Sequence, residues 1–332
     1  MPKKETNLAK KILSWYDNNY RRLPWRIGKN FQRIQYYRIL SEFMLQQTQV
    51  KTVLPYFARF IKKIPNLKIL SKSKEKRILK LWEGLGYYRR AKNLHKTSKI
   101  LVKFYNSKLP KNIKEMKRLP GIGEYTANAL LALVYNKPNI PIDGNVSRVF
   151  NRLFNKDIKI VDNEIKKRFK TKRNSDLAEA LMEFGAIICK PKNPLCNICK
   201  LKKECKFFNK EITLSKKKSL LFKKQNYNIF CYLNNKKEIA LTRNKNLSFL
   251  NNFKIPKTRI NFEEKNSKIK GWIHLCNYKN NISNIKMDIN LFYKFTDQKP
   301  KQFKWHSINR PTNEFVPSFT KKIFKKVSIL YK

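Results

Sequence analysis

The chain has 332 residues and carries 76 Lys or Arg against 22 Asp or Glu, which gives a formal net charge of +54. This length suggests two domains, and a hydrophobic content of 41 % is too high for a disordered polycation. The longest apolar run, residues 129–135, is far shorter than a membrane span, and the basic start lacks the apolar stretch of a secretion signal. We therefore expect neither a secreted nor a membrane protein, and the charge excludes an acidic enzyme. A polyanionic partner is indicated, although a genome that favours Lys codons would raise the charge in the same way.

Short helices are predicted for the first 205 residues, where apolar side chains recur at helical spacing and Gly or Pro marks the joins. After Cys205 a polar, basic stretch gives way to alternating and β-branched segments, and a last helix is predicted at 319–330. The predicted strands are 228–233, 238–243, 270–276 and 286–295. We therefore expect a mainly α domain at 1–209, a linker at 210–226 and a small α+β domain at 227–332.

Glu42 lies inside an apolar, helical stretch. A carboxyl group buried there would have a raised pKa, which a general acid needs near neutral pH. The plainer alternative is a Glu on the polar edge of the helix. Further along, the aromatic pair Tyr87 and Tyr88 follows Gly84 and Gly86. This pair could wedge between nucleic-acid bases or stack on them, or simply fill the core.

Gly121 and Gly123 precede a predicted helix in the segment Leu119-Pro-Gly-Ile-Gly-Glu-Tyr-Thr126. They let the backbone turn sharply and expose N–H groups at the start of that helix, which suits a phosphate oxygen. Taken alone, the segment is equally a turn between two helices. About one helix later, Asp143 precedes Gly144 and Asn145, where it would cap the next helix.

Four of the six cysteines, Cys189, Cys196, Cys199 and Cys205, form a C-x6-C-x2-C-x5-C cluster. Structural zinc usually takes two C-x2–4-C pairs, and the first and last gaps here are longer. The spacing therefore favours a [4Fe–4S] cluster, with zinc as the alternative. Disulfides are disfavoured because nothing suggests secretion. The distant Cys231 and Cys276 are expected to be small buried apolar residues.

In order and spacing, these segments resemble the helix-hairpin-helix DNA glycosylases with an iron–sulfur cluster. More narrowly, they resemble the MutY family, which removes adenine mispaired with 8-oxoguanine. The matching stretches are LPWR (23–26), SEFMLQQTQV (41–50), LWEGLGYYRRAKNLH (81–95), LPGIGEYTANAL (119–130), IDGNVSRV (142–149) and ALMEFGAIIC (180–189). The resemblance is strong over residues 8–206 and weak beyond them. It implies two α subdomains with an Fe–S loop at 189–205, followed by a Nudix-like α+β domain.

The resemblance also implies roles for individual residues. Glu42 matches the catalytic Glu that protonates adenine at N7, and Asp143 matches the Asp that stabilises the oxocarbenium-like sugar. Asn145 would help to hold Asp143 and the attacking water. The four clustered cysteines match the ligands of one [4Fe–4S] cluster. The positions matching base- or DNA-contacting residues are Trp25, Arg26 and Glu183 in the adenine pocket, Gln47 and Tyr87 as wedges, Gly121 and Gly123 at phosphate, and Ser283 at 8-oxoguanine.

Tyr125 distinguishes two branches of the superfamily. Endonuclease III-like relatives carry a Lys at this position, and its amine attacks the sugar and then cleaves the strand. A Tyr cannot form the Schiff base that this chemistry requires. The resemblance therefore implies a monofunctional glycosylase with Tyr125 in its catalytic site.

The chain departs from the family pattern in three places. The C-terminal part lacks the Nudix signature of clustered Glu, and the Phe-Ser-His loop that reads 8-oxoguanine appears as Ile282-Ser283-Asn284. Glu179 stands where a Gln is expected, and it either alters the charge of the pocket or faces solvent. The loop between Trp25 and Glu42 is a few residues longer than usual.

The partner implied is duplex DNA that contains adenine opposite 8-oxoguanine or guanine, bound by a monomer in the bacterial cytoplasm, at the nucleoid. One rival hypothesis is an endonuclease III-like glycosylase and lyase for oxidised pyrimidines, which Tyr125 and the C-terminal domain oppose. A second is a non-catalytic, basic nucleic-acid-binding protein, which would have lost Glu42 or Asp143. A third is an Fe–S redox sensor, whose activity would switch with the oxidation of its cluster.

Overall fold

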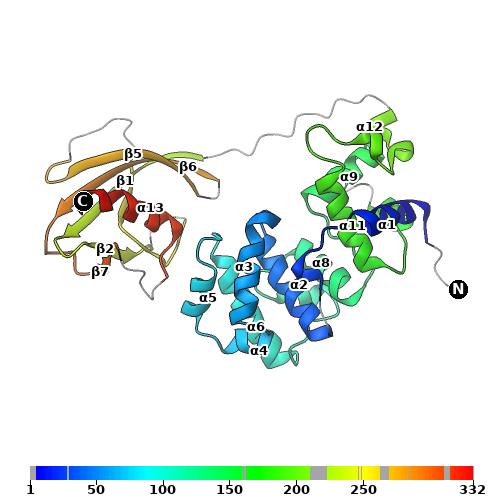
Figure 1. The fold of residues 1–332 in the computed structure, drawn as a ribbon, viewed down its shortest axis with the longest axis horizontal. Helices are drawn as coiled ribbons and strands as arrows, with labels where there is room; N and C mark the ends of the chain where they lie inside the picture. Colours follow the sequence, from blue (N-terminus) through cyan, green and yellow to red (C-terminus); the bar gives the residue numbers. More distant parts are fainter. Residues whose placement is uncertain are drawn as a thin grey trace. The chain divides into compact units, whose positions relative to one another are not determined.

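The computed structural model describes residues 5–27, 30–158, 160, 162–209, 223–245, 247, 249–261, 269–282, 284–309 and 315–331. These residues form two compact units (Figure 1), one made of residues 5–81 and 87–209 and the other of residues 82–86 and 223–331. Most of the expected linker, residues 210–222, lies outside the described residues. The predicted end of the linker at residue 226 is wrong, because the first strand of the second unit already begins at Lys223.

The described part of the first unit is helical, as predicted. Its elements are α1 (Asn7–Asn19), η1 (Pro24–Arg26), α2 (Phe31–Leu45), α3 (Val50–Lys63), α4 (Leu67–Lys72), α5 (Glu75–Leu81), α6 (Arg89–Phe104), α7 (Ile113–Arg118), α8 (Glu124–Tyr135), α9 (Gly144–Phe154), α10 (Asp162–Arg168), α11 (Asn174–Ile187), η2 (Cys196–Ile198), η3 (Lys202–Glu204) and α12 (Lys206–Asn209). Side chains of Asn30, Asn66 and Asn112 cap α2, α4 and α7 by accepting a backbone N–H three residues on.

One hydrophobic core joins α1, α9 and α11 to the cysteine loop. Trp15 of α1 packs edge-on against Phe184 of α11, with ring centroids 5.0 Å apart. Phe150 of α9 lies in the same core, and Cys189, Cys199 and Cys205 pack against it. Each large side chain buried in this way contributes about 1.5–3 kcal/mol. This core therefore fixes the start of α9 relative to α11, where several candidate site residues lie.

Helix α2 is buried on every side and packs against η1, α3, α6 and α8. Ile39, Leu40, Phe43 and Met44 are all fully buried, and polar residues of the same helix are buried with them. Residues 35–44 are thus covered on every face of the helix, which places this part of α2 in the interior of its domain. The side chains of α2 around residue 42 are therefore shielded from water.

The second unit contains a sheet of seven strands among its described residues, in the order β3-β2-β1-β6-β5, with β4 on β1 and β7 on β2. The strands are β1 (Lys223–Asn234), β2 (Glu238–Arg243), β3 (Lys254–Ile255), β4 (Lys257–Asn261), β5 (Ile273–Ile282), β6 (Ile285–Phe295) and β7 (Lys304–Ser307), followed by α13 (Ser318–Val327) and η4 (Ser328–Tyr331). β1 runs parallel to β6, with Ile229 beside Leu291, whereas β5 and β6 form an antiparallel hairpin.

Helix α13 packs on one face of this sheet (Figure 1), where Ile323 and Val327 belong to the same hydrophobic core as Ile229 and Leu233 of β1. The mainly α region followed by an α+β sheet domain is confirmed. Of the predicted strands, 270–276 lies too early because β5 starts at Ile273, and the short strands β3, β4 and β7 were not predicted. Cys231 is buried, as expected for a small apolar residue, whereas Cys276 is half-buried at the edge of the same core.

Candidate active site

Glu42 is buried one turn before the end of α2, with 6 % of its surface exposed. This burial is the main reason why its pKa is raised to about 7. The positive charge of Arg38 and hydrogen bonding with Tyr125 act in the opposite direction, whereas the negative charges of Asp143 and Glu179 raise the pKa further. The polar-edge alternative is therefore wrong. A carboxyl group that still holds a proton near pH 7 is suited to general-acid chemistry.

Asp143 caps the N-terminus of α9, and its carboxylate is fixed by three hydrogen bonds. Oδ1 accepts the backbone N–H groups of Asn145 at 2.9 Å and Val146 at 2.7 Å, and Oδ2 accepts the Asn145 side-chain amide at 3.1 Å. Arg148 in turn donates to the Asn145 side-chain oxygen at 2.8 Å and to the Gly185 carbonyl at 2.6 Å. The cap and the candidate catalytic carboxylate are thus one and the same group.

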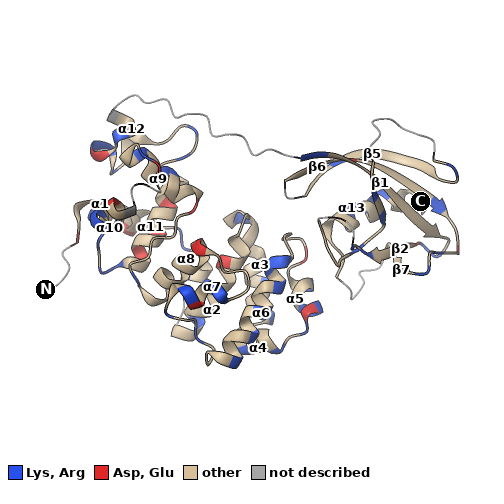
Figure 2. Cartoon of the chain, turned by 180° about the vertical axis from the view of Figure 1, so that it is seen from behind, with Lys and Arg blue, Asp and Glu red and all other residues tan. Residues whose placement is uncertain are grey.

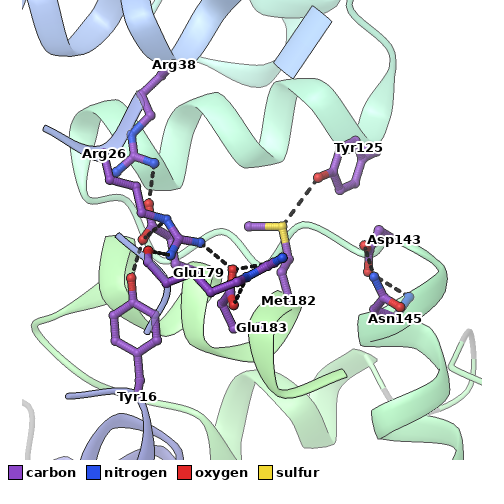
Figure 3. Close-up of polar contacts among 10 residues, drawn as sticks. Tyr16, Arg26, Arg38, Tyr125, Asp143, Asn145, Glu179, Met182 and Glu183 are labelled. Carbon is purple, nitrogen blue, oxygen red and sulfur yellow. Dashed lines mark hydrogen bonds and ion pairs between the residues drawn. The ribbon is translucent and has the colours of Figure 1, made fainter. Parts of the chain in front are cut away.

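Tyr125 of α8 lies with Glu42 and Asp143, as Figure 3 shows in part, and burial and both carboxylates raise the pKa of its hydroxyl well above the usual range. The hydroxyl also donates to the Met182 sulfur at 3.4 Å. Three of the predicted catalytic side chains therefore converge from three helices, and Asn145 holds one of them.

Arg26 and Glu183, both expected in the adenine pocket, are ion-paired at 2.8 Å. Arg21 also donates two hydrogen bonds of 2.7 Å each to the Glu183 carboxylate, and Glu183 is almost fully buried. Trp25, the third expected pocket residue, is buried with its ring edge against Phe57, 5.3 Å between centroids. The motifs did not include Arg21, because its partner lies 162 residues further along the chain.

Glu179 does not face solvent: it is 4 % exposed and lies among Arg26, Arg38 and Tyr16 (Figure 3). The solvent-facing alternative for this residue is therefore wrong. Its carboxylate adds a buried negative charge beside the charged pocket residues. The sequence did not identify Tyr16 or Arg38 as partners of Glu179. Hydrophobic periodicity indicates which residues are buried, but it does not indicate which side chain pairs with a buried charge.

The predicted wedge residues Gln47 and Tyr87 are both exposed and both adopt left-handed backbone conformations, with φ of 55° and 46°. Such conformations are uncommon for residues other than Gly and persist where surrounding contacts enforce them. Arg90 contacts the backbone next to Gln47 and the ring of Tyr87. Its guanidinium donates to the backbone carbonyls of Met44 and Gln46 at the end of α2, and it stacks 5.2 Å from the centre of the Tyr87 ring. Arg90 thereby links both wedge positions to the helix that carries Glu42.

Gly121 and Gly123 differ in what the fold requires of them. Gly121 has φ of 82°, and a Cβ atom there would lie 2.8 Å from both Phe43 Cε1 and Asn93 Cβ. Gly123 is the N-cap of α8, with φ of −89° and nothing within 4 Å of an added Cβ. Gly123 is exposed and has open space beside it, so the start of α8 has room for a phosphate.

Gly121→Ala is expected to lower the free energy of unfolding by about 1–3 kcal/mol, because it combines a strained φ with overpacking against Phe43. Chemical denaturation measures the loss. Gly123→Ala is the matched control and should cost less, since it meets neither problem. Equal losses for the two variants would contradict this account of the turn.

The four clustered cysteines are free thiols, and Cys199 lies close enough to the other three to interact with them electrostatically. The pKa of Cys199 is raised to about 11, mainly by burial and in smaller part by the three other thiols of the cluster. Arg152 donates to the Cys189 sulfur at 3.4 Å and to the carbonyl oxygens of Lys190 and Pro191. Within the described ranges, no three His, Cys, Asp or Glu side chains form a closed metal-ligand set. A donor set of thiols alone nonetheless suits an iron–sulfur cluster or zinc.

Ser283 lies outside the described residues, so its role stays a prediction. Its position falls between β5, which ends at Ile282, and β6, which begins at Ile285.

The described helices include no segment with the length and apolar character of a membrane span.

Comparison with known proteins bears on the same helices. The family described as HhH-GPD superfamily base excision DNA repair protein matches residues 40–174, which include Glu42, Tyr125 and Asp143. Among solved structures, a thermostable thymine-DNA glycosylase is similar, with a TM-score of 0.56 and 27 % identity over 61 % of this chain and 95 % of that one. A non-covalent endonuclease III–DNA complex, 20 % identical with a TM-score of 0.52, shows the shared fold alone. The family match and the fold thus define the class as that of the HhH-GPD superfamily base excision DNA repair proteins.

Two curated relatives narrow this class. An adenine DNA glycosylase of Buchnera aphidicola subsp. Baizongia pistaciae is 36 % identical over 95 % of both chains. An adenine DNA glycosylase of Buchnera aphidicola subsp. Schizaphis graminum is 31 % identical over 95 % of this chain and 96 % of its own. The chain belongs to the adenine DNA glycosylase family, which confirms the resemblance seen in the motifs.

Proposed function

We propose that this protein hydrolyses the N-glycosidic bond of adenine opposite 8-oxoguanine or guanine in duplex DNA, as a step of base excision repair. The observation that carries the proposal is the pair of carboxyl groups on α2 and at the start of α9. One is buried with a pKa of about 7, and the other is held by three hydrogen bonds at a helix N-terminus. Glycoside hydrolysis in general uses two carboxyl groups, one acid and one anion.

The two groups divide the chemistry between them. Adenine must first leave the base stack to reach buried side chains. Protonated Glu42 gives its proton to N7 of the extruded base, so that adenine leaves as a neutral molecule. The Asp143 carboxylate stabilises the positive charge that develops on the sugar. Water then attacks C1′, and ionised Glu42 takes up its proton. Asn145 keeps Asp143 in place by donating to it from both backbone and side chain.

Tyr125 supports hydrolysis without strand cleavage. Its buried hydroxyl lies beside both carboxyl groups, and a phenol cannot form the Schiff base that a lyase needs. An endonuclease III-like lyase is thereby disfavoured.

Duplexes with adenine opposite 8-oxoguanine should therefore lose the base but keep their strand. Breaks should appear only after hot alkali cleaves the abasic site, and borohydride should trap no enzyme–DNA adduct. A gel run with and without alkali measures this result. Strand breaks that form without alkali, or a trapped imine, would contradict a monofunctional enzyme.

Cys189, Cys196, Cys199 and Cys205 are proposed to hold one [4Fe–4S] cluster. When bound, the cluster would hold the loop 189–205 in one conformation by four metal–thiolate bonds. Arg152 and Arg148 already tie this loop to α9, since Arg148 donates to the Cys189 carbonyl at 2.7 Å. The loop is thus connected through Arg148 and Asn145 to the helix start that carries Asp143.

The DNA partner is supported by the charge of the chain. Lys and Arg occur on helices of the first unit and on strands of the second (Figure 2), and the net charge is +54. Binding to undamaged duplex should then depend steeply on salt, because bound cations are released from DNA.

The segment between β5 and β6, which contains Ser283, is proposed to recognise 8-oxoguanine. The proposed setting is a monomer in the bacterial cytoplasm, at the nucleoid.

A further inference from the structure

Glu179 has no part in the mechanism above, although its carboxylate lies deep in the first unit. Arg26 Nε is 2.8 Å from Oε2, Arg38 forms an ion pair with Oε1, and the Tyr16 hydroxyl donates to Oε2. All of these side chains come from other elements, η1, α2 and α1, and converge on α11 (Figure 3). A buried carboxylate is retained only where such partners compensate for its loss of water.

Arg38 connects this cluster to the catalytic acid. It precedes Glu42 by four residues on α2, so the two side chains lie on the same face of the helix one turn apart. Arg38 is 8 % exposed, and little water screens its charge from Glu42. Without a counter-charge, a guanidinium one helical turn from Glu42 would favour the ionised form of that carboxyl group. That form cannot donate a proton to adenine.

The other charged and titratable groups around Glu42 are already engaged. Tyr125 of α8 and Asp143 at the start of α9 belong to the catalytic site. Arg26 of η1 is paired with Glu179 and Glu183. Arg90 of α6 donates to backbone carbonyls at the end of α2. Arg38 is therefore the cation whose field on Glu42 depends most directly on Glu179.

We propose that Glu179 is a positioning residue that pairs with Arg38 and thereby keeps the neighbouring acid, Glu42, protonated near neutral pH. The inference rests on the proposed function. It also gives the substitution of Gln by Glu at this position a physical role, because an uncharged amide would leave the positive charge of Arg38 uncompensated beside the acid.

The test is the pH dependence of adenine release in single turnover, measured on a duplex with adenine opposite 8-oxoguanine. The wild-type rate should fall as the pH rises through about 7, where Glu42 loses its proton. Glu179→Gln should move this alkaline limb to lower pH by about one unit, because Arg38 then acts unopposed. Arg38→Gln should move the limb to higher pH. The double variant should bring it back toward the wild-type position.

Opposite shifts from two neighbouring residues are a signature that loss of structure alone would not produce. Thermal unfolding checks that each variant is folded, and Arg38→Gln decides the question if Glu179→Gln is too unstable to assay. Glu164→Gln, which removes a carboxylate paired with Arg168 on α10, is the matched control and should leave the limb in place. Variants that slow release equally at every pH would overturn the inference. Wild-type protein that releases no adenine from any duplex would instead overturn the proposed function.

Discussion

Glu42→Gln is expected to slow adenine release by at least about 10²-fold, which is the smallest contribution usually made by a general acid. The Gln amide fills the same buried space on α2 but has no acidic proton to give to N7 of adenine. Adenine would then have to leave as an anion, from an enzyme that otherwise binds DNA normally. Single-turnover release on an adenine–8-oxoguanine duplex, read by alkaline cleavage, measures the effect.

The control for this variant is its affinity for the same duplex, which should stay within a few-fold of wild type. Since the Gln carries no charge and Glu42 is about half protonated near pH 7, the fold should also be retained. A variant that releases adenine at a rate within about threefold of wild type would exclude Glu42 as the acid. A variant that has lost DNA binding as well would point to a structural fault instead.

Asp143→Asn is expected to slow adenine release by about 10²–10³-fold, because it removes the negative charge that we propose stabilises the developing oxocarbenium ion. Asn is as good an N-cap as Asp. The side-chain oxygen can still accept the backbone N–H groups of Asn145 and Val146, so α9 should keep its start. The variant therefore separates the charge from the cap, which in this protein belong to the same carboxylate.

Asp143→Ala supplies the comparison, because it removes both functions. It should lose a similar factor in rate and, in addition, about 0.5–2 kcal/mol of stability through the missing cap. Chemical denaturation of the two variants beside the wild type measures the difference. An Asn variant with an unchanged rate, or one as unstable as the Ala variant, would contradict the role assigned to Asp143.

The local motifs predicted several backbone features of this candidate site, because each motif combines a special backbone need with a chemical group. The cap at Asp143, the turn at Gly121 and the start of α8 all lie where the sequence placed them. The sequence alone does not decide whether Glu42 is buried, for a physical reason. Polar and apolar side chains of α2 are buried together, so the hydrophobic period of this helix does not separate a buried face from an exposed one.

The charged network around Glu179 could not be predicted, because its members come from distant parts of the chain. Tyr16 and Arg26 meet Glu179 across more than 150 residues, and only the packing of α1, η1 and α11 brings them together. The link from Arg90 to the wedge residues is similar. It depends on backbone carbonyls at the end of α2, which carry no sequence signal.

The most direct test of the central claim is the rate of adenine release from three duplexes that differ only in the base opposite adenine. We expect release from adenine opposite 8-oxoguanine and opposite guanine, at rates at least about tenfold above that from adenine opposite thymine; a tenfold difference corresponds to about 1.4 kcal/mol of discrimination. Equal release from the adenine–thymine duplex would contradict mismatch recognition, and no release from any duplex would contradict the glycosylase itself.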